Sequence, residues 1–252
     1  MSEEYRVARE VLPGPPDLAD AAAERFVALA QAAVAQRGRF AVALSGGSTP
    51  RALYERLARA PLSDQVDWPR VQVFWSDERF VPPDDAESCF RMAREALLDH
   101  VPVAADQIFP VPTVGGTPER AAQAYAETIV AQLGGELPRF DLVLLGMGPD
   151  AHTASLFPGQ PEPIAPGDAL VIAVHGSPKP PPTRISFSYR LINTAAQVLF
   201  LVAGADKAAP LREVLAGPAD RARLPAQGVR PGAGKLTWLL DAAAASQLSE
   251  TV

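Results

Sequence analysis

The sequence contains a single cysteine, Cys89, among its 252 residues. One thiol cannot form a disulfide within the chain, and it cannot supply a cysteine-based zinc cluster. A fold held together by disulfides is therefore excluded, and the cytoplasm is the expected location of the protein.

Long hydrophobic runs are also missing. No apolar segment approaches the ~20 residues that a membrane-spanning helix needs. The N-terminal stretch MSEEYRVARE carries charges of both signs and has no apolar centre, unlike a secretory signal peptide. We therefore expect no membrane partner and no export.

Positive charge is not in excess. Lys and Arg number 23 against 29 Asp and Glu, which gives a net charge of −6. No basic cluster is interleaved with aromatic residues, so nucleic acid is not an expected partner. If the substrate is an anion, backbone N–H groups and a few convergent Lys or Arg side chains must attract it locally.

The composition, with 48% hydrophobic and 21% charged residues, is that of an ordinary globular protein. The length suffices for one large α/β domain with a full core. We expect a single domain over residues 1–252, because the Pro-rich stretches at 158–166 and 178–182 look like surface loops rather than linkers.

Short apolar runs alternate with helical segments, which predicts right-handed crossovers and a mainly parallel sheet. The first helix should begin at Asp17 and end at Gly38. The expected strands cover residues 40–44, 71–75, 140–145, 170–174, 184–189, 198–203 and 236–240. The expected helices cover residues 17–36, 51–58, 87–98, 117–134 and 207–215, with a final Ala-rich helix.

A glycine-rich loop joins the strand at 40–44 to the next helix. Thr49 is the expected N-cap and Pro50 the first helical residue. Small hydroxyl residues and glycines at a helix N-terminus suit a phosphate monoester. The loop lacks the lysine of a Walker A motif, so a nucleoside triphosphate is not implied. The loop residues are Ser45, Gly46, Gly47, Ser48 and Thr49.

Two other interpretations of this loop stay open. It could be a tight strand-to-helix turn that binds nothing. Residues 43–47 also resemble a nucleophile elbow around Ser45. Against covalent serine catalysis, the serine follows the first strand and no late histidine completes the triad order.

The most informative turn follows the buried strand at 140–145. Open α/β sheets place their ligands at the carboxyl ends of such strands, and here the turn carries Asp150 and His152. We interpret His152 as the general base of a hydrolase, with a purely structural histidine as the alternative. A dinucleotide-like glycine pattern at 146–151 is rejected, because Pro158 ends the helix that a pyrophosphate site requires. No cofactor is expected.

Further charged residues lie at strand ends or helix starts. Asp77 and Arg79 follow the strand at 71–75, where they could form an exposed turn. If the sheet is parallel they share an edge with His152, and Arg79, oriented by Asp77, could stabilise a developing oxyanion. Arg184 and Lys207 are placed similarly, whereas Lys179, inside a proline loop, is expected in solvent.

The other two histidines give no metal signal. His100 closes a helix and His175 ends a strand. Neither has a carboxylate at metal-ligand spacing, so no metal site is expected.

Five segments together resemble the glucosamine-6-phosphate isomerase/6-phosphogluconolactonase family. They are ALSGGSTP (43–50), WSDERFVP (75–82), GMGPDAHTASLFPG (146–159), RISFSY (184–189) and LVAGADKA (201–208). The resemblance covers most of the chain in the family's order. It implies a Rossmann-like, doubly wound sheet with helices on both faces. It also implies metal-independent hydrolysis of 6-phospho-D-glucono-1,5-lactone in the pentose phosphate pathway.

One position departs from the family pattern, which usually has Asp-Gly-His where this chain has Asp150-Ala151-His152. If that position requires a positive φ, Ala151 is strained by about 1 kcal/mol. Activity is nevertheless expected to survive, since alanine otherwise adds only a methyl group.

The deaminase branch of the family is the nearest alternative, as an aldose–ketose isomerase. Its members look similar through the serine-glycine loop, but typically follow the histidine with an Ala-Phe-Asn-Glu-Pro-like run. This chain has TASLFP at 153–158, which lacks the acid, and Arg79 where that branch tends to place tyrosine. Both differences favour the lactonase.

The resulting hypothesis gives each residue a role. The serine-glycine loop, Lys207 and Arg184 hold the 6-phosphate, and His152, oriented by Asp150, activates a water molecule. Arg79 stabilises the oxyanion. A non-catalytic sugar-phosphate-binding module is the remaining alternative, but such a module should come with a DNA-binding helix-turn-helix, for which a single domain leaves no room. We expect a monomer.

Overall fold

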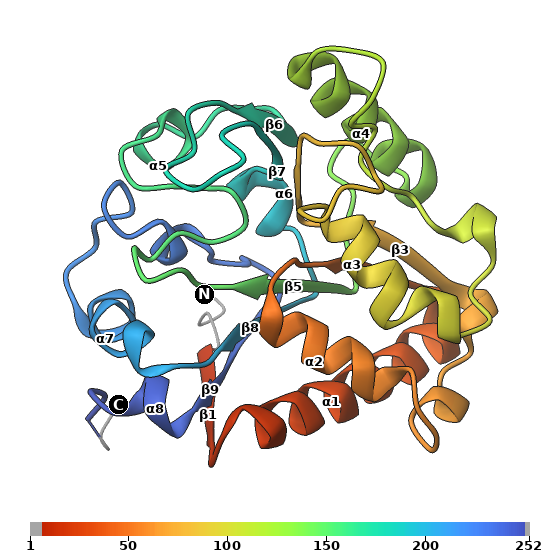
Figure 1. Ribbon diagram of the computed structural model, residues 1–252, viewed down its shortest axis with the longest axis horizontal. Helices are drawn as coiled ribbons and strands as arrows, with labels where there is room; N and C mark the ends of the chain where they lie inside the picture. Colours follow the sequence, from red (N-terminus) through yellow and green to blue (C-terminus); the bar gives the residue numbers. More distant parts are fainter. Residues whose placement is uncertain (1–6, 250–252) are drawn as a thin grey trace.

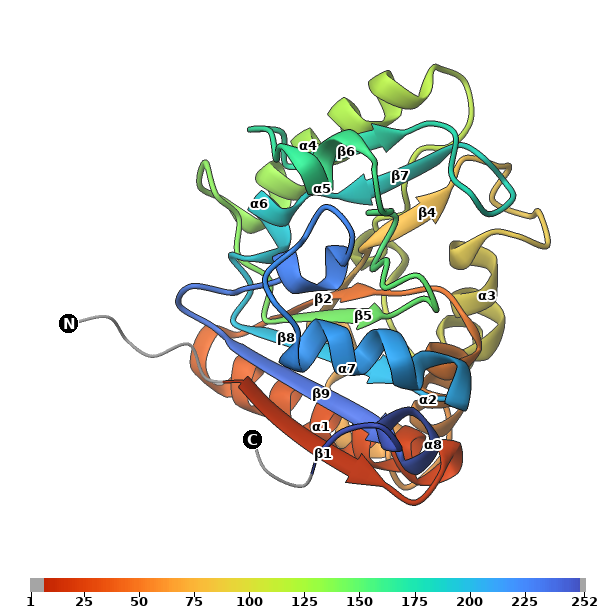
Figure 2. The same cartoon turned by 90° about the vertical axis from the view of Figure 1, so that its left-hand side faces the viewer.

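The computed structural model describes residues 7–249, with the exception of the side chain of Pro163. Its centre is a parallel sheet whose strands all point the same way (Figure 2). The order across this sheet is β1 (Val7–Leu12), β9 (Lys235–Asp241), β8 (Gln197–Val202), β5 (Leu142–Gly146), β2 (Phe40–Leu44) and β3 (Val71–Trp75).

The central strands are buried because their sequences are almost entirely apolar. Every residue of β2 and of β3 is buried, as expected of parallel strands covered on both faces. Helices α1 (Pro15–Arg37) and α2 (Ser48–Leu57) lie on one side of β5, and α4 (Pro118–Leu133) lies on the other (Figure 1). This is the doubly wound α/β architecture that the sequence predicts.

A second, antiparallel sheet was not predicted. It has the order β4 (Asp77–Arg79), β7 (Arg184–Phe187), β6 (Val171–Val174). The segment at 77–79 is therefore a short strand rather than an exposed turn, and the strands near 171 and 184 leave the parallel sheet to pair with it. Phe187 joins the two layers, because its N–H donates to Ser76 O at 2.8 Å and its ring lies 5.3 Å from that of Phe140.

The observed ends of helices α1 and α4 agree in part with the predicted ones. Gly38, at φ 72°, ends α1 as predicted, and Thr117 caps α4. Asp17 does not begin α1: the helix starts two residues earlier, at Pro15, and Asp17 lies in its first turn. A proline at the first helical position has no N–H to leave unbonded, which favours the earlier start.

The remaining elements are short. Ser88 caps α3, so this helix begins later than the predicted residue 87. The other helices are α3 (Cys89–Ala96), α5 (Pro161–Ile164), α6 (Tyr189–Ile192), α7 (Ala208–Ala216) and α8 (Ala242–Ala245). Short 3-10 turns are η1 (Ser63–Gln65), η2 (Trp68–Arg70), η3 (Leu98–His100), η4 (Ala105–Gln107), η5 (Ala205–Lys207) and η6 (Pro225–Gly228).

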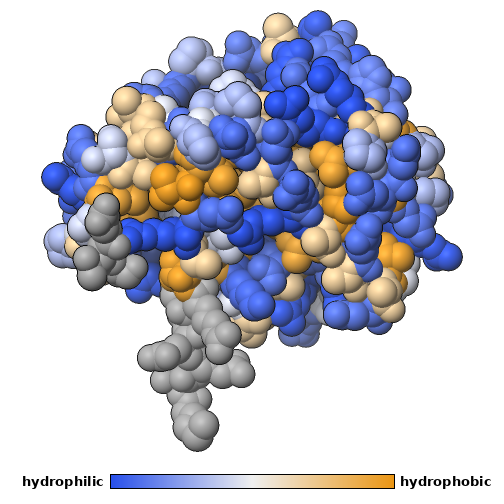
Figure 3. All heavy atoms as spheres, turned by 90° about the horizontal axis from the view of Figure 1, so that it is seen from below, coloured by the Kyte–Doolittle hydropathy of each residue, from blue (hydrophilic) through white to orange (hydrophobic). Residues whose placement is uncertain are grey.

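Buried side chains of both sheets belong to one hydrophobic cluster, which supports the expectation of a single domain. The face seen in Figure 3 mixes hydrophilic residues with small hydrophobic patches. Between residues 7 and 249, no helix is both long and apolar enough to cross a membrane.

Candidate active site

The serine-glycine loop lies between the end of β2 and the start of α2. The helix begins at Ser48 rather than after Thr49, because Gly47, at φ 107°, takes the cap position. The first helical hydrogen bond runs from Arg51 N–H to Gly47 O, so the N–H groups before it have no partner in the helix. The hydroxyls of Ser48 and Thr49 make no hydrogen bond within residues 7–249. The loop therefore offers free donors at a positive helix end.

Two contacts fix this loop. The hydroxyl of Tyr54 donates to Ser45 O at 2.8 Å and accepts from Ser45 N–H at 3.0 Å. A Cβ at Gly46 would lie 2.4 Å from the Sγ of Cys89, so only glycine fits against the start of α3. The loop is thus held from both sides before any ligand arrives.

The turn after β5 holds Asp150 against His152. The Nδ1 of His152 lies 2.5 Å from Oδ1 of Asp150, and the histidine side chain is 17% exposed. The ring of Phe157 packs against the imidazole at 4.6 Å. A Cβ at Gly148 would lie 2.0 Å from the imidazole, so a glycine is required for the turn to close.

The carboxylate of Asp150 is strongly stabilised in its charged form. Burial alone would raise its pKa, but the hydrogen bond with His152 and the charges of His152 and Lys179 lower it to about 2. A carboxylate that stays ionised can only accept a hydrogen bond. The Nδ1 of His152 is then the donor, and in a neutral imidazole the lone pair is on Nε2.

Arg79 is positioned by the short strand β4. Its Nη1 donates to Glu87 O at 2.5 Å and lies 3.6 Å from the carboxylate of the same residue. The neighbouring Glu78 is buried and accepts from the N–H groups of Arg79, Cys89 and Phe90 at 2.7 to 2.8 Å. Burial raises the pKa of Glu78 while these bonds lower it, and the net direction is upward. The network ties β4 to the start of α3.

Asp77 interacts with Arg79 through its charge rather than through a hydrogen bond. Its Oδ2 accepts instead from the hydroxyl of Ser155, at 2.7 Å, and both residues are buried. The segment that carries His152 is thereby joined to β4. Asp77 still lines the cleft described below.

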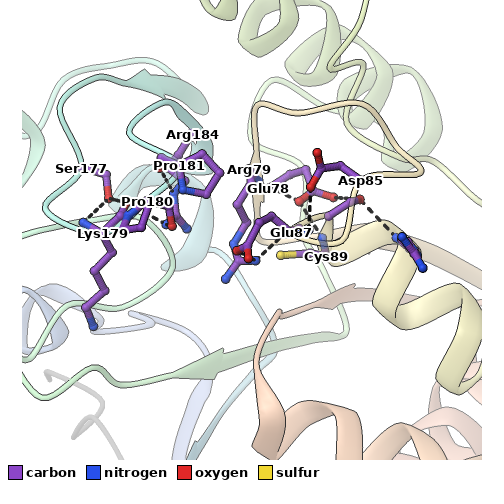
Figure 4. Close-up of polar contacts among 12 residues, drawn as sticks. Glu78, Arg79, Asp85, Glu87, Cys89, Ser177, Lys179, Pro180, Pro181 and Arg184 are labelled. Atoms are coloured by element: carbon purple, nitrogen blue, oxygen red, sulfur yellow. Dashed lines mark hydrogen bonds and ion pairs between the residues drawn. The ribbon is translucent and has the colours of Figure 1, made fainter.

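Arg184 fixes the proline loop across from Arg79 (Figure 4). Its guanidinium donates to the carbonyl oxygens of Pro181, Pro180 and Lys179 at 2.9, 3.0 and 3.2 Å. Burial lowers the pKa of Arg184, although carbonyl partners compensate the lost hydration. Lys179, expected in solvent, has a side chain that is 42% exposed, but it also lines the cleft, where its Nζ lies 3.9 Å from Oδ1 of Asp150.

These groups converge on one cleft of about 340 Å³. Asp150 supports His152 from the turn behind it, and Lys207 at the cleft pairs with Asp206. Sequence reasoning missed Lys179, Glu78 and Cys89, and only the proline-rich flanks of Lys179 gave a signal. The predicted residues that line the cleft are Ser45, Gly46, Gly47, Ser48, Thr49, Asp77, Arg79, His152, Arg184 and Lys207.

The groups at the cleft are of the types that could bind an anion and carry out acid–base catalysis on it. Four cationic side chains and one imidazole surround it. Within the described residues, no group of three or more His, Cys, Asp or Glu is arranged to hold a metal ion.

The chain is similar to proteins of one family along almost its whole length. A sequence model described as "Glucosamine-6-phosphate isomerases/6-phosphogluconolactonase" matches residues 13–238. A 6-phosphogluconolactonase of Nostoc sp. is 43% identical over 95% of this chain and 98% of its own length. One of Streptomyces coelicolor is 42% identical over 93% of this chain and 92% of its own.

Solved structures agree with the sequence comparisons. The 6-phosphogluconolactonase from Trypanosoma brucei superposes with a TM-score of 0.84 at 33% identity, covering 98% of this chain and all of that one. A monomeric glucosamine-6-phosphate deaminase reaches a TM-score of 0.80 over 96% of this chain and 99% of its own, at only 19% identity. The second likeness shows the shared fold alone.

The backbone at Ala151 provides a stability test. Its φ is 61° and the residue is fully buried. Ala151→Val should lower the free energy of unfolding by about 2 kcal/mol or more, because a β-branched residue is poorly tolerated at positive φ and the site has no spare room. For a chain of this size, that corresponds to a fall in Tm of about 4 °C or more.

Ala151→Gly is the matched control. Relief of about 1 kcal/mol of strain is offset by the loss of a buried methyl group, about 0.8 kcal/mol, and by a more flexible unfolded chain. Its Tm should stay close to that of the wild type. Equal Tm values for the valine and glycine variants, measured by calorimetry, would contradict the strain argument.

The lowered pKa of Asp150 predicts a pH-dependent contribution to stability. Because the pKa is about 2 in the folded protein and about 3.9 when unfolded, the ionised carboxylate stabilises the fold above about pH 4. This contribution is lost as the pH falls toward 2. The side chain is 32% exposed, so solvent screening limits the effect to about 1 kcal/mol or less.

Urea unfolding from pH 6 to pH 3 tests this expectation. The stability difference between the wild type and Asp150→Asn should shrink as the pH falls below about 4. Asp168→Asn is the control, because Asp168 pairs with Arg190 at the exposed surface. A difference for Asp150→Asn that stays constant over this range would refute the assignment.

Proposed function

The chain belongs to the glucosamine-6-phosphate isomerase/6-phosphogluconolactonase family and is a lactone hydrolase. We propose that it converts 6-phospho-D-glucono-1,5-lactone to 6-phospho-D-gluconate. The reaction belongs to the oxidative pentose phosphate pathway. The observation that carries the proposal is the Asp150–His152 pair, which stands at the same cleft as the serine-glycine loop and Arg79.

The phosphate is bound at the N-terminus of α2. A phosphate monoester carries close to two negative charges at pH 7. The free N–H groups and hydroxyls of Ser48 and Thr49 donate to it, and the positive helix end adds to the attraction. Lys207 and Arg184, which line the same cleft, supply cationic charge. This binding holds the lactone ring toward His152.

Hydrolysis begins with water attacking C1 of the lactone. The Nε2 of His152 takes one proton from the water as the new C–O bond forms. The electron pair of the carbonyl bond moves to its oxygen, and Arg79 stabilises the resulting oxyanion. Asp150 holds the imidazole in the required tautomer and stabilises its protonated form.

The second step opens the ring. The oxyanion re-forms the carbonyl bond, and the bond between C1 and the ring oxygen breaks. Protonated His152 returns its proton to the leaving ring oxygen, and the new carboxylic acid releases a proton to solvent. No acyl-enzyme is required, because water positioned beside the carbonyl can attack it directly. No metal enters the proposed steps.

Location and assembly remain predictions. We propose that the protein acts as a monomer, because the proposed mechanism calls for no residue of a second subunit. We propose a cytoplasmic location, while noting that relatives from rice are named as chloroplastic.

His152→Gln tests the general base. The variant should lose about 10²- to 10⁴-fold in kcat, the usual contribution of a general base, and should still bind 6-phosphogluconate. The measurement is acid release from freshly prepared lactone, corrected for spontaneous hydrolysis. His175→Gln is the matched control, because His175 pairs with Glu119 at the exposed surface. Full turnover by His152→Gln would exclude the role.

Arg79→Ala tests the oxyanion role. Loss of one oxyanion-stabilising group typically lowers kcat about 10²- to 10³-fold, with a smaller change in the affinity for 6-phosphogluconate. Arg91→Ala is the control, since Arg91 pairs with Glu95 one turn along α3 and does not line the cleft. Kinetics of Arg79→Ala equal to those of the control would remove Arg79 from the mechanism.

A further inference from the structure

A second large cavity lies at the end of the parallel sheet where the strands begin, opposite the end that carries the cleft. Its volume is about 1250 Å³. Several of its lining residues precede or begin the strands: Arg39 comes before β2, Asp141 comes before β5, and Lys235 begins β9. Because the strands are parallel, this edge is remote from the turn that carries His152. In Figure 2 it corresponds to the tail ends of the arrows.

This cavity is strongly basic in a chain whose net charge is −6. Of the described residues that line it, Arg37, Arg39, Arg139 and Lys235 are cationic and Asp141 is the one acid. The acid is already paired, because Arg37 Nη2 lies 2.6 Å from its Oδ1. The other three cations have no acidic partner within residues 7–249.

Two of the arginines are held in place by carbonyl oxygens. Arg39 donates to Gln132 O at 2.8 Å and to Leu133 O at 3.1 Å, and Arg139 donates to Ala233 O at 3.0 Å. Carbonyl groups fix the guanidinium without neutralising it. Each guanidinium has five N–H donors, so further donors remain for a ligand.

These bonds also tie neighbouring segments together, which is a purely structural use of the arginines. The side chain of Lys235 has no comparable structural role. It is exposed on the first residue of β9, and its Nζ makes no hydrogen bond or ion pair with any residue from 7 to 249. The cavity is therefore lined by one free ammonium and by two guanidinium groups that the fold holds in place.

Part of the cavity wall is apolar. Leu29, Leu133 and Leu137 line it, and Leu137 is 50% exposed. The cavity can therefore hold an organic group beside the charged one.

We propose that this cavity is a second anion site, which binds a polyphosphate group, either free or carried by an organic molecule such as a nucleoside triphosphate. Arginine forks match phosphate oxygens in pairs. Cations from three separate segments suit several linked phosphates better than a single one. The site is separate from the proposed phosphate loop at α2.

Isothermal titration with inorganic tripolyphosphate and with ATP, without metal ions and at low ionic strength, tests the site. The titrations use wild-type protein saturated with 6-phosphogluconate and, independently, Lys207→Gln, which weakens the proposed catalytic phosphate site. Binding should persist in both and weaken as salt is added. Tighter binding of ATP would identify an organic carrier as the ligand form, and equal binding would identify the polyphosphate group alone.

Variants then locate the binding. Loss of two charged donors in Arg139→Gln/Lys235→Gln should weaken binding about tenfold or more. Lys235→Gln alone should weaken it severalfold without disturbing a contact within the fold. Arg120→Gln, which removes an exposed positive charge on α4, is the matched control and should bind as the wild type does.

The proposal is overturned if neither probe binds, or if both are displaced by 6-phosphogluconate. It is also overturned if Lys235→Gln and Arg139→Gln/Lys235→Gln bind as tightly as Arg120→Gln. Circular dichroism and Tm establish whether each variant is folded. If the double variant does not fold, the binding measured with Lys235→Gln alone decides whether the proposal stands.

Discussion

The buried hydrogen bond between Ser155 and Asp77 joins the two halves of the site. The hydroxyl donates to the carboxylate at 2.7 Å, and the N–H of Ser155 donates to the hydroxyl of Ser186 at 3.1 Å. One end of this link follows the turn of His152, and the other is the short strand of Arg79. A buried carboxylate is costly without such a donor, so the link helps to hold His152 and Arg79 at the same cleft.

The fold gathers cationic side chains at the cleft although the chain as a whole carries a net negative charge. The chain is acidic overall, yet three of the four cations of the cleft have close partners: a carbonyl and a carboxylate for Arg79, three carbonyls for Arg184, and a neighbouring carboxylate for Lys207. The same strategy recurs at the far edge of the sheet, where carbonyls hold arginines. A local field of this kind attracts an anion even though the whole protein repels it.

The parts of the fold that the sequence predicts are those set by local pattern. β2 and β3 match their predicted bounds because unbroken apolar runs belong to strands buried on both faces. β1 was missed because charged residues interrupt it at the sheet edge, and β4 because three polar residues form a strand only by pairing with β7. In the cleft, the residues at parallel strand ends were predictable. Lys179 was not predictable, since its position depends on the bonds that Arg184 makes to its loop. The Ser155–Asp77 bond was not predictable either, because its partners are 78 positions apart in the sequence.

The anchoring of the proline loop by Arg184 has a consequence for affinity. Three carbonyl oxygens in succession are bound to one buried side chain, so the loop gives up its mobility when the chain folds. Binding of a small molecule then has little of this loop's backbone to immobilise. Less of the binding free energy is therefore lost to ordering the loop. The wall that carries Lys179 should therefore behave as a rigid template, and the rate of product departure should be governed by contacts to the ligand rather than by the opening of a flap.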